Sequence, residues 1–350
     1  MAVRVRFAPS PTGSLHLGNA LIAVANRRFA DEHEGRLLVR IDDTDRVVPG
    51  GEEAVLGELD WLGVPYDEGP IRQSERADAH RAAAERLITG GHAYEDDGVV
   101  RARFRGGHTL VRQDGRPTYH LASVVDDLEF GITHVLRGKD LLPATDLHRH
   151  LAEALGAHPP EYIHLGLLVG PDGKKLSKRH GASTLADLRE AGIPAEAVRA
   201  YLEELGRPRG DVHLDLVRIR RLALDAIAAM TDEDLAERVD VPPWVAPALR
   251  GARDLEEARR FADSILAPPD YRVPASAKPT LERFRELRER VNGELDADTA
   301  RGLIREVKAV GGDLRALRLA LTGSDRGPEL WTVLLALPRE ETLRRIDAQL

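Results

Sequence analysis

The sequence contains no cysteine, so disulfide bridges, thiolate zinc sites and thiol nucleophiles are excluded. It also lacks any apolar run near the roughly 18 residues that a membrane-spanning helix needs. Its first residues do not form the apolar core of a secretory signal. Together these absences predict a cytoplasmic protein with no membrane-embedded part.

The sequence has no excess of positive charge either. The formal net charge is −8 at pH 7, which argues against nucleic-acid binding through overall charge but is compatible with a local basic face. Hydrophobic residues make up 42% and charged residues 31% of the sequence, as in ordinary globular proteins. The length of 350 residues is enough for two or three domains with hydrophobic cores of their own.

The first thirty residues combine a strand, a tight loop and a helix. An extended run over residues 3–7 precedes a proline-containing loop, and Ser14 is a plausible N-cap for the helix that follows. The apolar stripe of this helix consists of Leu17, Leu21 and Val24. His16 lies at the loop–helix junction, where nucleotides bind in open α/β folds. A phosphate-binding histidine and a merely exposed one both fit this position.

Strand-like and helix-like segments alternate through the first half of the chain, which predicts a parallel sheet flanked by helices. Polar, glycine-containing residues 95–107 interrupt this alternation. The expected strands are 37–41, 118–125, 133–136 and 162–169, and the expected helices are 52–62, 76–88 and 146–155.

After about residue 185 the strand signals disappear, and helical periods rich in Ala, Arg, Glu and Leu take over. Prolines within residues 268–279 indicate a linker between domains. Residues 281–350 are predicted to form several short helices in which arginines alternate with acidic residues. This pattern fits a solvated helical face, and it fits a nucleic-acid-binding surface as well.

A basic motif follows the last predicted strand. Pro171, Asp172 and Gly173 predict a turn, and lysine, serine and arginine dominate residues 174–179. Lysines in such a loop could reach a polyphosphate, whereas an ordinary solvated loop would have the same composition.

The two motifs together resemble the signatures of the class I aminoacyl-tRNA synthetases. His16-Leu17-Gly18-Asn19 is similar to the family's HIGH motif, and Lys175-Leu176-Ser177-Lys178-Arg179 is similar to its KMSKS motif. Further stretches resemble the glutamyl-tRNA synthetases specifically, and they follow the family's order over most of the chain. These stretches are residues 6–13, 40–46, 73–76, 117–127, 131–138 and 317–323.

The resemblance implies glutamate–tRNA ligase activity, in which glutamate attacks the α-phosphate of ATP and the glutamyl-adenylate then acylates the 3′ end of a tRNA. The attacking carboxylate is already ionised at neutral pH and needs no general base. The implied ligands are ATP with Mg²⁺, glutamate and a tRNA, with no metal site of the protein's own, and the implied state is a monomer. The implied catalytic residues are His16 and Lys178, and the implied ATP-binding residues are His16, Gly18, Asn19, Leu168, Lys175, Ser177 and Lys178.

A glutamate pocket is implied as well. Arg6 and Arg137 would bind carboxylates, because a guanidinium suits bidentate contact with them. Asp42 stands where the family usually has Glu, and Ser123 stands where it often has Asn, so two polar side chains of the pocket are smaller here. The implied glutamate-binding residues are Arg6, Ala8, Ser10, Asp42, Tyr119, Ser123 and Arg137.

The family's acceptor-stem-binding insert is almost absent. Residues 1–94 and 112–205 correspond to the two halves of a Rossmann-like catalytic domain, and residues 95–111 are too few for an independent domain. Residues 206–270 are expected to form a helical stem domain, and residues 271–350 a helical anticodon-binding-like domain. The predicted fold class is therefore α/β, with a Rossmann-like catalytic domain followed by an all-α C-terminal region.

Two other enzyme functions are alternatives to a shortened glutamate–tRNA ligase. One is a glutamyl-queuosine-type enzyme that modifies a tRNA base, although that family normally lacks an anticodon-binding part and often carries a cysteine-ligated zinc. The other is a paralog that passes an activated amino acid to a different acceptor. The presence of His16, Lys178, Arg6, Tyr119 and Arg137 argues against a regulatory paralog without activity.

Overall fold

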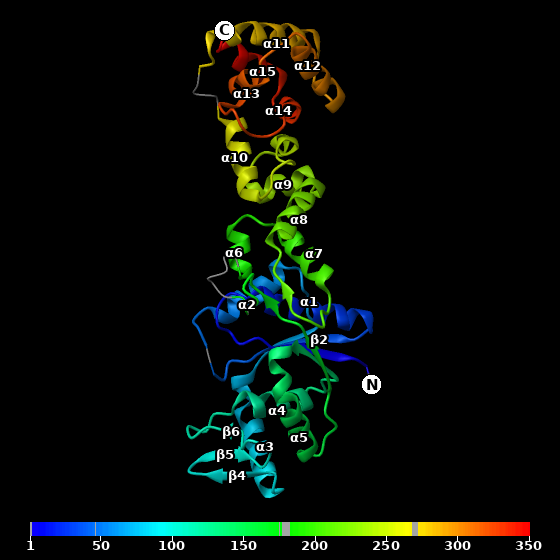
Figure 1. Cartoon of the computed structure of the whole chain (residues 1–350), viewed down its shortest axis with the longest axis vertical. Coiled ribbons are helices and arrows are strands. Elements are labelled where there is room, and N and C mark those ends of the chain that lie inside the picture. Colours follow the sequence, from blue (N-terminus) through cyan, green and yellow to red (C-terminus); the bar gives the residue numbers. More distant parts are fainter. Residues whose placement is uncertain (1, 46, 175, 177–182, 268–271) are drawn as a thin grey trace. The chain divides into compact units, whose positions relative to one another are not determined.

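The computed structural model describes residues 2–45, 47–174, 176, 183–267 and 272–350. The chain forms two compact units, whose elements are labelled in Figure 1. The first unit consists of residues 1–189 and 199–215, and the second consists of residues 190–198 and 216–350.

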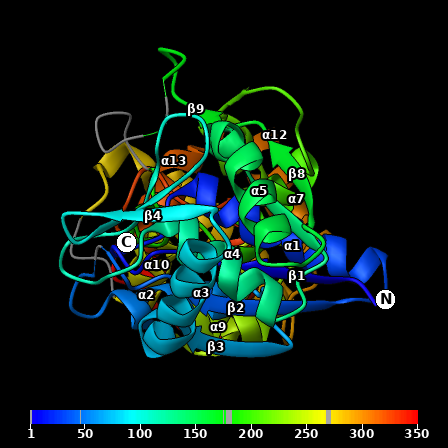
Figure 2. The same cartoon turned by 90° about the horizontal axis from the view of Figure 1, so that it is seen from below.

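Parallel strands form the centre of the first unit. β1 (Arg4–Phe7), β2 (Arg36–Ile41) and β3 (Glu68–Arg72) pair in that order, as Figure 2 shows. β7 (His134–Gly138) pairs with β8 (Glu161–Leu165), and the N–H of Thr133 donates to the carbonyl of Arg4 beside them. The apolar run of β2 is buried on both faces, as expected of a parallel strand that helices cover.

The helices of this unit begin close to the predicted positions. α1 (Leu17–Glu32) buries the predicted apolar stripe. α2 (Gly51–Trp61), α3 (Ala77–Thr89) and α5 (Thr145–Ala154) each begin within one residue of the predicted start. Among the described residues, the remaining helices between residues 73 and 205 are η1 (Gln73–Arg76), α4 (Tyr119–Glu129), η2 (Lys139–Ala144), α6 (Leu185–Glu190) and α7 (Ala195–Leu205), and α7 spans the boundary between the two units.

The strand predicted over residues 118–125 is wrong, because this segment forms the N-terminal part of α4. The run of Leu121, Val124 and Val125 contains β-branched residues, which favour a strand. Their spacing nevertheless continues to Leu128 with the period of a helix, and α4 packs this apolar face on α3 and α5. Tertiary packing therefore decides the structure against local propensity.

Residues 93–111 form a small antiparallel sheet of β4 (Ala93–Asp96), β5 (Val99–Ala102) and β6 (Thr109–Val111). Asp97 and Gly98 connect β4 to β5 with positive φ angles of 50° and 74°. A type I′ hairpin turn requires this conformation, and Asp-Gly is one of its favoured sequences. Val100 and Leu110 are buried and join the hydrophobic core of α3, α4 and α5.

The second unit is helical throughout its described residues. Thr231, Asp254, Asp296 and Asp313 cap four of its helices with side-chain hydrogen bonds. One hydrophobic core extends from Ile227 to Ile346. The helices are α8 (Leu216–Ala229), α9 (Asp232–Val239), η4 (Pro243–Ala248), α10 (Leu255–Leu266), η5 (Ala275–Ala277), α11 (Lys278–Arg290), α12 (Ala297–Ala309), α13 (Leu314–Thr322), α14 (Leu330–Ala336) and α15 (Arg339–Asp347).

One strand lies beyond the point where strand signals were expected to end. β10 (Val212–His213) belongs to the first unit and pairs in parallel with β9 (Leu168–Val169). Two residues are too few to show an alternating pattern, so the sequence gives no sign of this strand.

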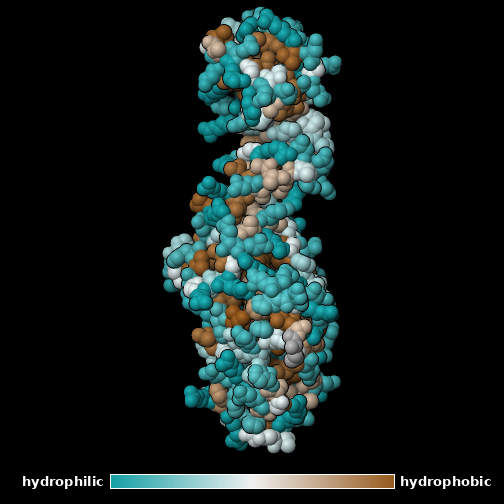
Figure 3. Space-filling model, turned by 90° about the vertical axis from the view of Figure 1, so that its right-hand side faces the viewer, coloured by the Kyte–Doolittle hydropathy of each residue, from teal (hydrophilic) through white to brown (hydrophobic). Residues whose placement is uncertain are grey.

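The surface of the molecule is mixed in character. On the face shown in Figure 3, hydrophilic side chains predominate and hydrophobic ones lie in small groups between them. Among the residues that the structure describes, no helix combines the length and the apolar character needed to cross a membrane.

Candidate active site

A cavity of about 460 Å³ lies where β1, β2 and β7 end and α1 begins. In open parallel sheets, ligands bind at this carboxyl edge of the strands. The lining brings together residues from both predicted sets. Arg6, Ala8, Ser10, Asp42, Tyr119 and Arg137 come from the predicted glutamate site, and His16, Gly18, Asn19 and Leu168 come from the predicted ATP site.

α1 begins at this cavity with His16 as its N-cap residue, in an extended conformation with φ −65° and ψ 149°. The imidazole is exposed and makes no capping hydrogen bond. The prediction of Ser14 as N-cap is wrong, because the helix begins two residues later and the Ser14 hydroxyl donates to Glu58. The positive end of a helix dipole favours phosphate binding at this place.

The two sequence motifs border the same cavity. The N–H of Leu17 donates to the carbonyl of Ser183 at 3.0 Å, and the N–H of Leu185 donates to the carbonyl of Leu15 at 2.9 Å. The chain that follows the basic motif is therefore fixed against the start of α1. Leu176, from within that motif, also lines the cavity. The predicted residues Lys175, Ser177 and Lys178 lie outside the described residues.

Arg137 on β7 is only 3% exposed and lines the cavity. Its guanidinium donates to the Tyr119 hydroxyl at 3.2 Å and to Thr145 Oγ1 at 2.9 Å. It also lies 3.2 Å from His148 Nδ1 and 3.3 Å from His164 Nε2. All four of these groups can accept a hydrogen bond without carrying a negative charge.

The protonated, cationic form of the histidines around Arg137 is electrostatically disfavoured. Burial lowers the pKa of His148 well below its ordinary value, and the charge of Arg137 lowers it further. The same two causes lower the pKa of His164. His120 lies 3.1 Å from His148, from Nδ1 to Nε2, and its pKa is lowered by burial, by His108 and by Arg137. These rings are therefore neutral at neutral pH.

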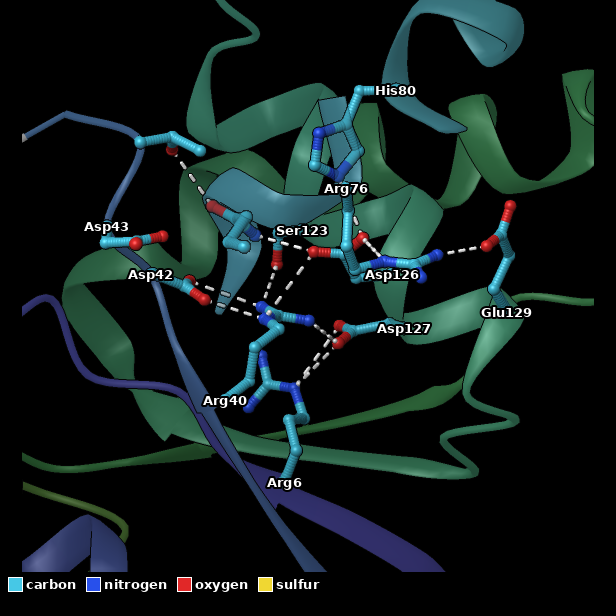
Figure 4. Close-up of polar contacts among 12 residues, drawn as sticks. Arg6, Arg40, Asp42, Asp43, Arg76, His80, Ser123, Asp126, Asp127 and Glu129 are labelled. Carbon is cyan, nitrogen blue, oxygen red and sulfur yellow. Dashed lines mark hydrogen bonds and ion pairs between the residues drawn. The ribbon is translucent and has the colours of Figure 1, made fainter. Parts of the chain in front are cut away.

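A buried ion-pair network fixes Arg6 and Asp42 (Figure 4). The fully buried Arg40 donates to Asp42 Oδ1 at 2.6 Å and to Asp127 Oδ1 at 2.8 Å. Arg6 Nε donates to both carboxylate oxygens of Asp127, at 3.1 and 3.3 Å. Burial would lower the pKa of Arg40, but Asp42 and Asp127 outweigh burial and raise it well above its ordinary value.

Asp126 forms a second layer of this network (Figure 4). Its carboxylate accepts from Gln73 at 2.9 Å and from Arg76 at 2.8 Å, and it lies 2.8 Å from His80 Nε2. Burial raises the pKa of Asp126, yet the hydrogen bond from His80 and the charge of Arg40 lower it by more. This carboxyl is therefore ionised and helps to hold Arg40 in place.

Ser123 is not among the residues that line the cavity. It is buried, and its hydroxyl accepts from Arg40 Nη2 at 3.4 Å. Sequence reasoning assigned no role to Arg40, Asp127, His148 or His164. The first two lie within stretches that carry the family resemblance, whereas single histidines on a helix and a strand leave no local pattern.

Comparison with known families supports this geometry. Residues 2–100 and 99–214 match the family described as tRNA synthetases class I (E and Q), catalytic domain. Residues 243–350 match the family described as anticodon binding domain, which does not favour the glutamyl-queuosine-type alternative. The two catalytic stretches meet at residues 99–100, directly after the turn between β4 and β5.

Relatives match along nearly the whole chain. Glutamate–tRNA ligase 1 of Rubrobacter xylanophilus is 37% identical over 423 aligned positions, which cover 99% of this chain and 97% of the relative. The alignment exceeds the 350 residues of this chain, so the relative has residues without a counterpart here. Glutamate–tRNA ligase 2 of Halorhodospira halophila is 31% identical, with 98% and 97% coverage.

A solved structure has the same fold. The glutamate tRNA ligase of Elizabethkingia meningosepticum, crystallised in complex with its amino acid, superimposes with a TM-score of 0.79 and 25% identity. The match covers 100% of this chain and 99% of that one. The predicted α/β fold with a helical C-terminal region is confirmed, and the chain belongs to the class I aminoacyl-tRNA synthetases, in the glutamate–tRNA ligase family.

Proposed function

We propose that the chain activates glutamate with ATP in this cavity and transfers the glutamyl group to the 3′ end of a tRNA. One observation carries the proposal: Arg137 and Asp42 line the same cavity as His16 at the start of α1. Glutamate has carboxylates that fit a cation and an ammonium that fits an anion, while a helix N-terminus fits a phosphate.

Charge stabilisation is the main chemical task of such a site. A carboxylate oxygen of glutamate attacks the α-phosphorus of ATP, the bond to the bridging oxygen breaks, and pyrophosphate leaves. His16 and Lys178 donate hydrogen bonds to the phosphoryl oxygens as charge develops on them. Mg²⁺ enters with the triphosphate and neutralises part of its charge. The tRNA ribose hydroxyl then attacks the adenylate carbonyl, and AMP leaves.

The proposal gives roles to the polar side chains that line the cavity and were predicted from the sequence. Arg137 binds a substrate carboxylate, and because the Tyr119 oxygen accepts from Arg137, its own proton is available to that carboxylate. Asp42 binds the ammonium. Arg6, Ala8 and Ser10 complete the glutamate site, and Gly18, Asn19 and Leu168 bind ATP. The proposal also assigns Ser123 to the glutamate site, and Lys175 and Ser177, which lie outside the described residues, to ATP binding.

Recognition of the tRNA is assigned to the second unit, in line with the match of residues 243–350 to an anticodon-binding domain. The enzyme acts as a monomer in the cytoplasm, with residues 1–94 and 112–205 forming the catalytic domain, residues 206–270 the stem domain and residues 271–350 the anticodon-binding part. Residues 95–111 replace the acceptor-stem-binding insert.

Charging assays test this proposal. Purified protein is incubated with ATP, Mg²⁺ and total tRNA, and with labelled glutamate, aspartate or glutamine in separate reactions. We expect acid-precipitable label with glutamate alone. Equal charging with aspartate would show that Asp42 and Ser123 have changed the substrate. Adenylate formation without any charged tRNA would show that a different acceptor is used.

A further inference from the structure

Three arginines near the cavity are paired with carboxylates, two of them buried, whereas the buried Arg137 is not. Arg6 and Arg40 contact Asp127, and Arg76 contacts Asp126. Arg137 has no carboxylate within ion-pair distance among the described residues, and its neighbours are hydroxyls, ring nitrogens and the face of Tyr162 at 4.7 Å from Cζ. Its charge is therefore fixed in position without being neutralised.

Two histidine ring nitrogens take the place of carboxylates as hydrogen-bond acceptors of Arg137. His148 Nδ1 lies 3.2 Å from Arg137 Nη1, and His164 Nε2 lies 3.3 Å from Arg137 Nε. A guanidinium only donates, so each of these nitrogens has to be unprotonated to accept. The proton of neutral His148 then resides on Nε2, from which it points to His120 Nδ1 at 3.1 Å. The contacts thus define one tautomer for each of these rings.

The surroundings of both histidines keep them neutral. His148 faces Arg6 from β1, Arg137 from β7, His120 from α4 and His108 from the loop before β6. His164 faces Arg137 and Arg149, and its Nε2 lies 3.1 Å from the Thr145 hydroxyl, which accepts from Arg137 and can donate to this nitrogen. The arginines and histidines around the two rings are cationic or become so on protonation, and none of them would stabilise an imidazolium ion.

We propose that His148 and His164 are positioning residues, which hold the Arg137 fork through neutral acceptors and so leave its whole charge for the substrate carboxylate. A carboxylate in either place would fix the arginine equally well, but it would compete with the substrate for the same cation. The inference rests on the proposed function, since it assigns the partner of Arg137 in that reaction.

A dependence on pH follows from this arrangement. Protonation of His148 or His164 would set an N–H donor against the donors of Arg137 and add a like charge beside it. The Michaelis constant for glutamate should therefore rise only at a pH below the ordinary histidine value of about 6.5, because the pKa of both rings is lowered. The substrate carboxylates remain ionised down to about pH 4.5, so they do not cause this rise.

The test measures glutamate charging of tRNA at several pH values between about 4.5 and 8 for four proteins, since the pKa of both histidines is lowered. In the double variant His148→Asn, His164→Gln, an amide oxygen can replace each accepting nitrogen without titrating. We expect it to charge glutamate with a Michaelis constant within about threefold of the original at pH 7.5, and to lose the rise at acid pH. His148→Leu removes an acceptor, and we expect its constant for glutamate to rise roughly tenfold, with the constant for ATP unchanged.

His150→Asn is the matched control, because His150 is on the same helix but contacts His92 and Phe104 instead of Arg137. The His150→Asn variant should keep both the original Michaelis constant for glutamate and its pH dependence. If the acid rise persists in the double variant, or if His148→Leu folds and leaves the glutamate constant unchanged, the inference is wrong. If the original protein charges no glutamate at any pH, the proposed function itself fails, which is a separate result.

Discussion

Arg137 and Arg40 are both buried guanidinium groups, but they occupy opposite electrostatic situations. Arg40 donates to Asp42 and Asp127 and is fully enclosed. Arg137 donates to neutral groups and borders a cavity. Replacing the first should therefore affect stability, and replacing the second should affect substrate binding.

Arg137→Lys should be nearly as damaging as Arg137→Ala. A lysine ammonium is a point charge and cannot reproduce a planar fork with four acceptors around it. We expect the Michaelis constant for glutamate to rise by roughly 100-fold in both variants, or about 3 kcal/mol, as when a buried charge loses its partner. A near-normal constant in the lysine variant would assign Arg137 a structural role instead.

Arg40→Leu should destabilise the first unit by about 3–5 kcal/mol, because Asp42 and Asp127 would then be buried without their common counter-ion. Urea unfolding at neutral pH measures this loss. Arg81→Ala is the control, since the pair of Arg81 with Asp78 is largely exposed and such pairs contribute less than about 1 kcal/mol. Similar urea midpoints for Arg40→Leu and Arg81→Ala would contradict a stabilising role of the buried ion-pair network.

At the level of secondary structure, the start of α1 connects the sequence motif to the chemistry. His16→Ala should lower the rate of glutamyl-adenylate formation by about 10²-fold, because a donor to the phosphoryl oxygens acts mainly in the transition state. The Michaelis constant for ATP should change little. His33→Ala, at the other end of the same helix, provides the control. A collapse of ATP affinity with turnover preserved would refute this role.

The elements around the cavity differ in how far the sequence predicts them. The loop from Phe7 to His16 was identified from its prolines and glycine, which fix a strand–turn–helix path whatever the tertiary context. The helical state of α4 was missed, and the predicted strand ended before Asp126 and Asp127. The helix continues through both residues and buries both carboxylates.

The histidines were missed for a different reason. His148 on α5 and His164 on β8 meet at Arg137, because β8 pairs in parallel with β7 and α5 brings His148 to the same guanidinium. No spacing in the sequence encodes such a meeting. Arg137 could be predicted from its motif, but the neutrality of its surroundings follows from the fold.

At the scale of the whole molecule, the continuity of the second hydrophobic core limits how the chain can be divided. Leu235 from α9 and Ile265 from α10 share one core with Phe284 and Val333 from later helices. A cut near residue 270 therefore passes through a core, while a cut after residue 215 leaves only residues 190–198 of the second unit attached to the first.

We expect residues 1–215 to stay folded and resist proteolysis, while residues 1–270 lose protection in α8, α9 and α10, whose apolar faces become exposed. Limited proteolysis with mass spectrometry checks this. Both fragments should lose the tRNA binding of the full chain. The association constant of the full chain for tRNA should fall with about the first power of the salt concentration for each phosphate neutralised. Equal tRNA affinity of fragment and full chain would refute recognition by the second unit.

The turn between β4 and β5 has a consequence for how such enzymes diversify. Asp96 and Val99 are paired across it, so the chain leaves and re-enters the sheet at adjacent points. A domain whose own termini lie close together could be inserted at this turn without changing how the rest of the chain forms the cavity. Choice of nucleic acid and choice of amino acid would then be separate traits, which evolution or an engineer could exchange independently.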